Sequence, residues 1–175
     1  DYHSGLGLGM HQQNRNHLHR ILARMTDYVE TESGQPSQYA EYVRRQGKNR
    51  FEVEHILANK FERHREDYAD ENEFDRHRNR LGGLLLMPKS FNASYGAQPY
   101  EDKRKHYFGQ KLLAQSLHES AYESNPGFLR FIEDSGLAFR PHESFTRTDL
   151  DARQELYTEL AKRIWNPEDL LRGVE

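Results

Sequence analysis

The feature that most constrains the fold is the stretch FEVEHILAN at residues 51–59. Apolar and polar side chains alternate along it, with Phe51 and Val53 on one side, which is the pattern of a β-strand with one buried face. His55 falls on that apolar face, directly after Glu54. A titratable ring there is either a hydrogen-bonded core residue or part of a site. The motifs around His55 are needed to distinguish a core residue from a site residue.

A second strand pattern, Leu-Leu-Leu-Met at residues 84–87, ends at Pro88. Only two or three strands are expected among many helices. A two-stranded hairpin is not stable alone in water, so the helices must pack on it. The expected fold class is therefore α+β. Helical periodicity predicts helices over residues 11–32, 38–45 and 126–135, and a last helix that begins at Thr148 or Asp149.

Two segments carry turn or loop signals. Residues 59–80 are charged and aperiodic, and are expected to form a long loop or a loop with a short helix. Gly136 is expected to end the helix that precedes it. Ser90 or Asn92 is expected to cap a short helix after the second strand. The glycine-rich residues 1–10 are expected to be a flexible leader.

Composition excludes several classes of protein. The 175 residues include no cysteine, which rules out disulfides, thiolate zinc sites and a cysteine nucleophile. The sequence contains no run of about 18 apolar residues, so no segment is expected to span a membrane. The mean hydropathy of −1.05 describes a very polar chain. The absence of cysteine fits a reducing cytoplasm. The net charge of −3 argues against bulk attraction to nucleic acid, although residues 76–80 and 103–106 form basic patches.

A strand, a loop, a second strand and a helix start follow one another between residues 51 and 95. This ββα order would bring His55 close to Asn92. A histidine with a pKa near 6.5 can take a proton from water at neutral pH. A divalent cation held by the Glu54 carboxylate and the Asn92 amide could polarise a phosphate. Together these groups suffice to hydrolyse a phosphodiester.

At these residues the chain resembles the C-terminal HNH nuclease domain of GmrSD-type restriction enzymes. The resemblance is carried by EHI, LGGLLL, FNASYG and PYEDK, in that order, and by the closing helix with DLDARQELYTELAKRIW. It implies a ββα-metal (His-Me finger) core and a metal-dependent DNA endonuclease, or nickase. It also implies that His55 activates water, while Glu54 and Asn92 hold one Mg²⁺ or Mn²⁺ ion.

The resemblance also implies a domain plan and a cellular setting. Residues 51–172 would form the nuclease domain, and residues 11–50 a helical extension or a linker to an upstream domain. The chain, which begins at Asp1 and not at Met, would be the effector half of a larger restriction or phage-defence protein of the bacterial cytoplasm. Its upstream partner would be a ParB-like, nucleotide-hydrolysing domain.

One position departs from the family pattern. The family has an asparagine where this chain has Gly83, and that asparagine's amide orients the catalytic histidine. Asn79 is the nearest replacement, four residues upstream. In an extended strand four residues span roughly 13 Å, so the loop would have to fold back to bring Asn79 to His55.

Four basic residues are candidates for contacts with the DNA backbone. Arg78 and Arg80 are expected to contact phosphates, because a guanidinium binds phosphate in a fork. Lys89 is a further candidate for a DNA contact. Lys103 either contacts the scissile phosphate or stabilises a turn of the core.

Two alternatives remain open at the level of sequence. The chain could be a catalytically degenerate His-Me finger that serves as a nucleic-acid-binding or protein-docking module, and Gly83 favours that reading. It could also be a purely helical interaction domain, in which residues 51–58 would be helical. Asn92 on its own could be no more than a helix cap.

Overall fold

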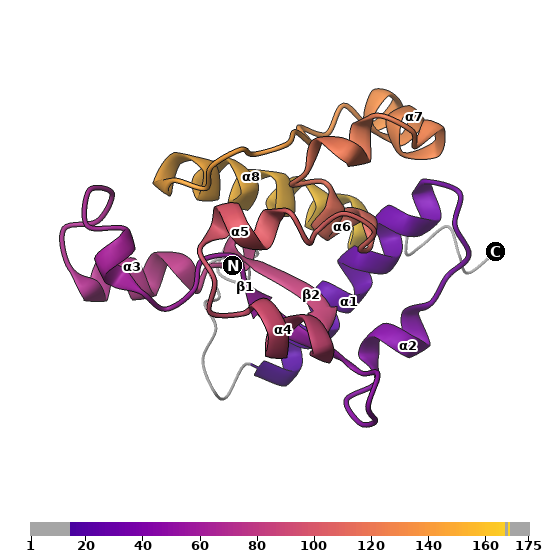
Figure 1. Ribbon diagram of the computed structural model, residues 1–175. Coiled ribbons are helices and arrows are strands. Elements are labelled where there is room, and N and C mark those ends of the chain that lie inside the picture. Colours follow the sequence, from indigo (N-terminus) through magenta and orange to yellow (C-terminus); the bar gives the residue numbers. More distant parts are fainter. Residues whose placement is uncertain (1–14, 167, 169–175) are drawn as a thin grey trace.

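The computed structural model describes residues 15–166 and residue 168. The expected leader over residues 1–10 and the expected end of the nuclease domain at residue 172 lie outside the described residues. The main elements, labelled in Figure 1, are α1 (Arg15–Glu32), α2 (Tyr39–Val43), β1 (Phe51–His55), α3 (Glu71–Arg78), β2 (Leu84–Pro88), α4 (Lys89–Tyr95), α5 (Tyr100–Arg104), α6 (Leu112–Gln115), α7 (Pro126–Ser135) and α8 (Arg147–Ile164). Short 3₁₀ turns occur at Phe61–Arg63, Leu81–Gly83 and Glu119–Tyr122.

The two strands form an antiparallel pair in which Phe51 lies opposite Pro88 and His55 opposite Leu84. Pro88 has no amide hydrogen, and it occupies a position of the ladder where none is required. The strand observed at residues 51–55 confirms the strand predicted from the alternation in the sequence. The alternative of a purely helical domain is therefore wrong. Many helices around one small sheet agree with the α+β prediction.

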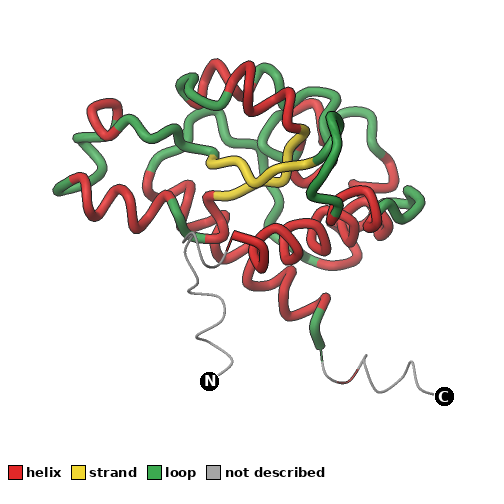
Figure 2. Tube along the Cα trace, turned by 90° about the horizontal axis from the view of Figure 1, so that it is seen from below, coloured by secondary structure: helices red, strands yellow, loops and turns green. Residues whose placement is uncertain are grey.

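The small sheet separates two hydrophobic clusters, with helices on both of its sides (Figure 2). Leu84 and Leu86 belong to a cluster with α1, α6, α7 and α8. Leu85 and Met87 point the other way, into a cluster that also contains residues of α3, α4 and α5. Successive side chains of a strand point to opposite faces, so β2 contributes to both clusters. Because both of its faces are buried, its sequence is continuously apolar.

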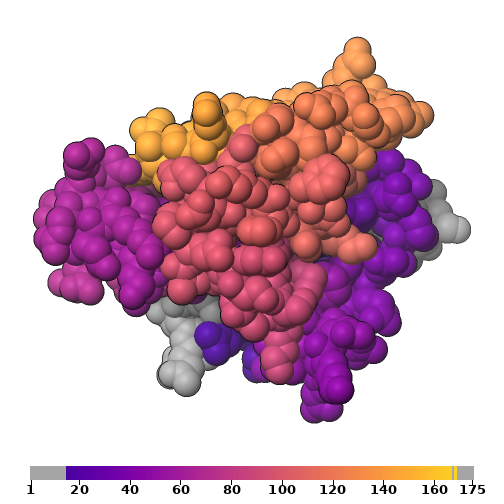
Figure 3. Space-filling view, viewed as in Figure 1, coloured from indigo at the N-terminus to yellow at the C-terminus, as the bar shows by residue number. Residues whose placement is uncertain are grey.

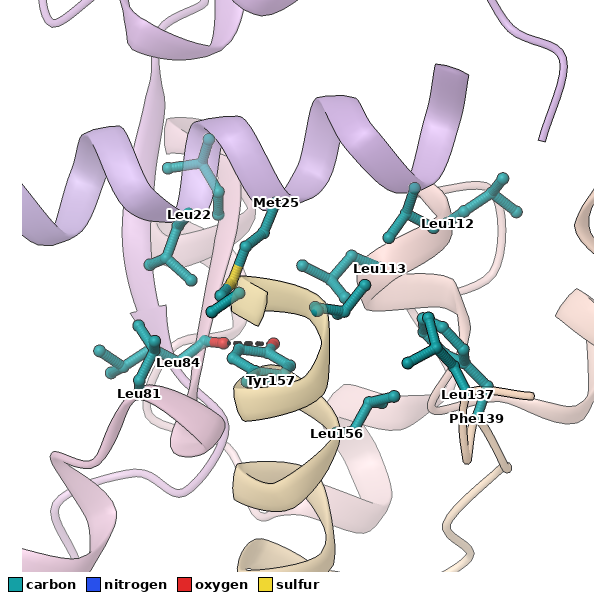
Figure 4. Close-up of a cluster of buried hydrophobic side chains, with 14 of the residues drawn as sticks. Leu22, Met25, Leu81, Leu84, Leu112, Leu113, Leu137, Phe139, Leu156 and Tyr157 are labelled. Carbon is teal, nitrogen blue, oxygen red and sulfur yellow. Dashed lines mark hydrogen bonds between the residues drawn. The ribbon is translucent and has the colours of Figure 1, made fainter. Parts of the chain in front are cut away.

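Helices α1 and α8 close the first cluster over the sheet (Figure 4). The hydroxyl of Tyr157 on α8 donates a hydrogen bond of 2.7 Å to the Leu84 carbonyl oxygen. A buried hydrogen bond of this kind contributes about 1 kcal/mol to stability. It ties α8 to the first residue of β2. Helix α1, expected to be an extension, packs into this cluster through Leu18, Leu22 and Met25.

The sequence signals at helix ends are largely confirmed. Gly136 ends α7 in the left-handed conformation, with φ of 69°. Helix α8 starts slightly earlier than expected, with Thr146 as its cap, because the Thr146 hydroxyl accepts from the Asp149 amide in a capping box. Neither Ser90 nor Asn92 caps α4; both lie inside it, after Pro88.

Helix α3 lies at one end of the molecule, where its segment forms a lobe beside the body (Figures 1 and 3). Asp70 caps it by accepting from the Glu73 amide at 2.8 Å. Its anchor is Phe74, which is fully buried in the second cluster. The charged stretch at residues 59–80 is thus a loop with a short helix. No helix in the described part of the chain is long and apolar enough to cross a membrane.

Candidate active site

The centre of the site is His55, at the end of β1, where it meets Asn79, the residue that ends α3. The His55 Nε2 atom lies 2.7 Å from the Asn79 amide oxygen Oδ1. The Asn79 amide nitrogen donates to the Asp75 carbonyl oxygen at 2.7 Å and to the Asp75 carboxylate at 3.2 Å. Asp75 therefore fixes which end of the amide faces the imidazole ring.

This orientation sets the tautomer of His55. An amide oxygen only accepts hydrogen bonds, so Nε2 must carry the proton that is shared with Asn79. In the neutral ring, Nδ1 is then left with a lone pair, which can accept a proton. Burial, together with the nearby Arg78 guanidinium, lowers the pKa of His55 to about 4, although the hydrogen bond to Asn79 acts in the opposite direction. The ring is thus neutral at pH 7, in the form that a general base requires.

The turn between Asn79 and β2 explains how the chain brings Asn79 back to His55. After α3, a 3₁₀ turn at Leu81–Gly83 reverses the chain before β2 begins. A Cβ atom at Gly83 would lie 2.7 Å from the Arg78 carbonyl oxygen, so no asparagine fits there without a backbone shift. The estimate of roughly 13 Å holds only for an extended chain.

Glu54 and Lys103 form a buried pair directly beside His55. The Lys103 ammonium is fully buried and lies 3.4 Å from Glu54 Oε1. It also donates a 2.7 Å hydrogen bond to the His55 carbonyl oxygen. Burial raises the pKa of the Glu54 carboxyl to about 7, against the lowering effect of Lys103. Of the two roles open to Lys103 in the sequence, this placement favours the support of a core turn over contact with a phosphate.

Asn92 lies in α4, which packs against both strands. Its side chain is half-buried and makes no hydrogen bond within the described part of the chain. Phe91, the preceding residue, anchors α4 in the second cluster on the face of the sheet that also carries Leu85. Glu54 pairs with Leu85 in the strand register, so its side chain and α4 share that face.

The remaining basic candidates differ in exposure. Arg78 is nearly buried, and its Nε donates to the Leu57 carbonyl oxygen at 3.1 Å. Arg80 is exposed and donates to Asp151 at 3.2 Å. Lys89, also exposed, is the first residue of α4. Arg80 and Lys89 are therefore accessible to a phosphate, whereas Arg78 lies close to His55 and affects its pKa.

The donor atoms fit a hard divalent cation in kind. Glu54 Oε2 is buried without a hydrogen-bond partner, and the Asn92 amide has none within the described residues. Mg²⁺ keeps several waters and uses few protein oxygens together with substrate phosphates. The described residues contain no group of three or more His, Cys, Asp or Glu side chains that could hold a metal. An ion at this site would thus depend on the substrate for part of its coordination.

Sequence reasoning missed Asp75, which positions Asn79 and through it His55. The signal was present, because residues four apart on a helix are neighbours. The contact between Asp75 and Asn79 could have been predicted only if α3 had been expected to extend to residue 78.

A comparison with protein families decides which family the chain belongs to. Residues 7–160 match the family described as GmrSD restriction endonucleases, C-terminal domain. The chain belongs to this family. No curated protein and no solved structure matches it at a significant level. Membership in the GmrSD C-terminal domain family implies a restriction endonuclease domain, whose chemistry is the hydrolysis of phosphodiester bonds.

Proposed function

We propose that this chain is a metal-dependent DNA endonuclease domain of the HNH type, in which His55 activates the attacking water. The contact that carries the proposal is the 2.7 Å hydrogen bond between His55 Nε2 and Asn79 Oδ1. It leaves Nδ1 as the proton acceptor and keeps the ring in one orientation. Asn79 thereby supplies the amide that Gly83 lacks, which removes the main reason to regard the site as degenerate.

The reaction follows from these groups. His55 Nδ1 takes a proton from a water molecule while the water oxygen forms a bond to phosphorus. The phosphorus–oxygen ester bond on the opposite side breaks, and the leaving oxygen takes up a proton from solvent. Asn79 accepts a hydrogen bond from Nε2 throughout, so it also stabilises the imidazolium that forms. A low pKa makes His55 a weak base, but a bound phosphodiester brings negative charge that raises this pKa toward neutrality.

Glu54 and Asn92 would hold the Mg²⁺ or Mn²⁺ ion, which when bound polarises the phosphate and stabilises its leaving oxygen. Arg80 and Lys89 would contact phosphates of the DNA backbone, because both side chains are exposed. Lys103 would act from within the core, by holding the His55 backbone in place.

By the family resemblance we also place this domain in a larger bacterial restriction or phage-defence protein. A ParB-like, nucleotide-hydrolysing domain upstream would control when the nuclease acts. The full-length protein would work in the cytoplasm, where the DNA substrate is found.

Nicking of supercoiled plasmid tests this function. Purified chain should convert supercoiled to open-circular DNA with Mg²⁺ or Mn²⁺ and not with EDTA. His55→Ala and Asn92→Ala should abolish nicking, whereas His17→Ala, a change at an exposed histidine of α1, should leave it intact. DNA binding that persists in all variants, with no nicking by the wild type, would instead support a binding module.

A further inference from the structure

A cavity of about 300 Å³ borders β1 at a place that the candidate active site does not use. It lies between the first turn of α1, the segment that leads into β1, and the strand itself. The described residues that line it include Arg15, His19, Arg45, Arg50, Phe51, Glu52 and Val53.

The cavity is positively charged, although the chain as a whole has a net charge of −3. Arg15 and Arg45 are exposed and have no ion pair or hydrogen bond within the described part of the chain. Arg50 pairs with Glu52 at 2.9 Å, which neutralises the one carboxylate among the described lining residues. Two guanidinium groups are therefore left without a compensating carboxylate among the described residues of one concave site, which concentrates the field on an anion.

The open edge of β1 carries backbone hydrogen-bond donors beside the same cavity. The Ile56 amide donates to the Gly83 carbonyl oxygen at 2.9 Å, and the Lys89 amide to the Arg50 carbonyl oxygen at 2.9 Å. In an antiparallel pair this places the backbone groups of even-numbered β1 residues toward β2, and those of odd-numbered residues toward the open edge.

Among the described residues, one contact occupies an end of this open edge. The His55 carbonyl oxygen accepts the Lys103 hydrogen bond described above. The backbone groups of Phe51 and Val53 have no hydrogen-bond partner among the described residues, and both residues line the cavity. Backbone amides and arginine side chains are the groups that bind nucleic-acid phosphates in proteins.

His19 forms a neutral wall of the cavity. It is buried, with Nε2 at 2.7 Å from the Tyr42 carbonyl oxygen, so Nε2 carries a proton. Burial lowers the pKa of its ring. The positive charge of the cavity thus comes from arginines, which stay charged at all physiological pH values.

We propose that this cavity binds one backbone phosphate of the nucleic acid whose scissile bond lies at His55. The proposal rests on the proposed nuclease function. Phe51 and His55 lie on one strand, about 13 Å apart at 3.3 Å per residue. That distance is well within one turn of a duplex, about 34 Å. A strand of DNA held at His55 can therefore reach Arg45 along the open edge of β1.

Binding in EDTA tests the cavity separately from cleavage. A short fluorescent DNA duplex is titrated with the full chain carrying His55→Ala, with and without Arg15→Gln and Arg45→Gln, over a series of NaCl concentrations. The matched control removes two exposed cations outside the cavity, in Arg130→Gln and Lys162→Gln. Losing one phosphate contact should reduce the slope of log affinity against log salt by about 0.9, and the affinity roughly three- to tenfold. The control should change neither.

The outcomes separate the possible explanations. A slope equal to that of the parent would overturn the proposal, whether or not the wild type nicks DNA. A reduced slope with no nicking by the wild type would support the cavity and reject the nuclease function. Inorganic pyrophosphate provides the second arm of the test. If it binds the parent but not the double variant, and the DNA slope is unchanged, the cavity holds a free phosphate compound and the DNA assignment is wrong.

Discussion

The Asn79 amide oxygen lies 2.7 Å from His55 Nε2, and the Asn79 amide nitrogen lies 2.7 Å from the Asp75 carbonyl oxygen. The second contact orients the amide, and the first then selects the tautomer of the imidazole ring. In the proposed mechanism Asn79 is a positioning residue, which holds the base His55 without touching the substrate. Its place at the end of α3 would make that short helix part of the active site.

The low pKa of His55 makes the stability of the fold depend on pH. The unfolded chain binds this proton near pH 6.5, but the folded chain binds it only near pH 4. Protonation therefore favours the unfolded state as the pH falls between these values. At pH 5 the effect should be about 2 kcal/mol. Urea unfolding of the wild type and of His55→Gln near pH 7 and near pH 5 measures it.

The part of the loss in free energy of unfolding between pH 7 and pH 5 that comes from His55 should be absent in His55→Gln. His17→Gln should behave as the wild type. Glu54 titrates in the same range, but its contribution is common to both proteins and cancels in their difference. Equal losses of stability in the wild type and His55→Gln would show that His55 is not held neutral by the fold.

The buried pair of Glu54 and Lys103 should matter for stability. Lys103→Met leaves the Glu54 carboxyl and the His55 carbonyl oxygen buried without their partner. Removing one member of such a pair costs about 3–5 kcal/mol in the free energy of unfolding. Adding Glu54→Gln should recover part of this loss, because the two residues are coupled. Urea unfolding of the single and double variants measures the coupling.

Lys105→Met is the matched control, since Lys105 is exposed and only two residues away. It should change the free energy of unfolding by less than about 0.5 kcal/mol. A Lys103→Met protein as stable as this control would mean that the pair does not support β1.

Gly83 should not accept the asparagine of the family pattern. Its Cβ would meet the Arg78 carbonyl oxygen at 2.7 Å, so Gly83→Asn should destabilise the fold by about 1–3 kcal/mol. Gly109→Asn is a suitable control, because nothing lies within 4 Å of a Cβ there and asparagine tolerates positive φ. Thermal or urea unfolding of both variants gives the comparison.

The same substitution also tests how the site is arranged. Transferring the asparagine, in Asn79→Gly with Gly83→Asn, should fail to restore plasmid nicking. Nicking at the wild-type rate in this double variant would mean that the family arrangement works here and that Asn79 is dispensable.

The sequence was sufficient to predict the two strands and most of the helices, because alternation, capping and turn residues act locally. It predicted Asn79 as the replacement for the missing asparagine, but not its distance from His55. That distance depends on how tightly the 3₁₀ turn packs Gly83 beneath the Arg78 carbonyl. The burial of Lys103 likewise could not be predicted from the sequence, because it results from the contact of α5 with the end of β1. No local pattern encodes such a contact between distant segments.

The most direct test of the account is the dependence of nicking rate on pH in Asn79→Asp and Asn79→Ala. A carboxylate at position 79 still accepts from Nε2, and its negative charge should raise the pKa of His55 by about one unit or more. The acidic limb of the rate profile should therefore move to higher pH in Asn79→Asp, while Asn79→Ala should lose roughly 10²- to 10⁴-fold in rate. An unchanged acidic limb in Asn79→Asp, together with a near-normal rate in Asn79→Ala, would contradict the assignment of His55 as a base oriented by Asn79.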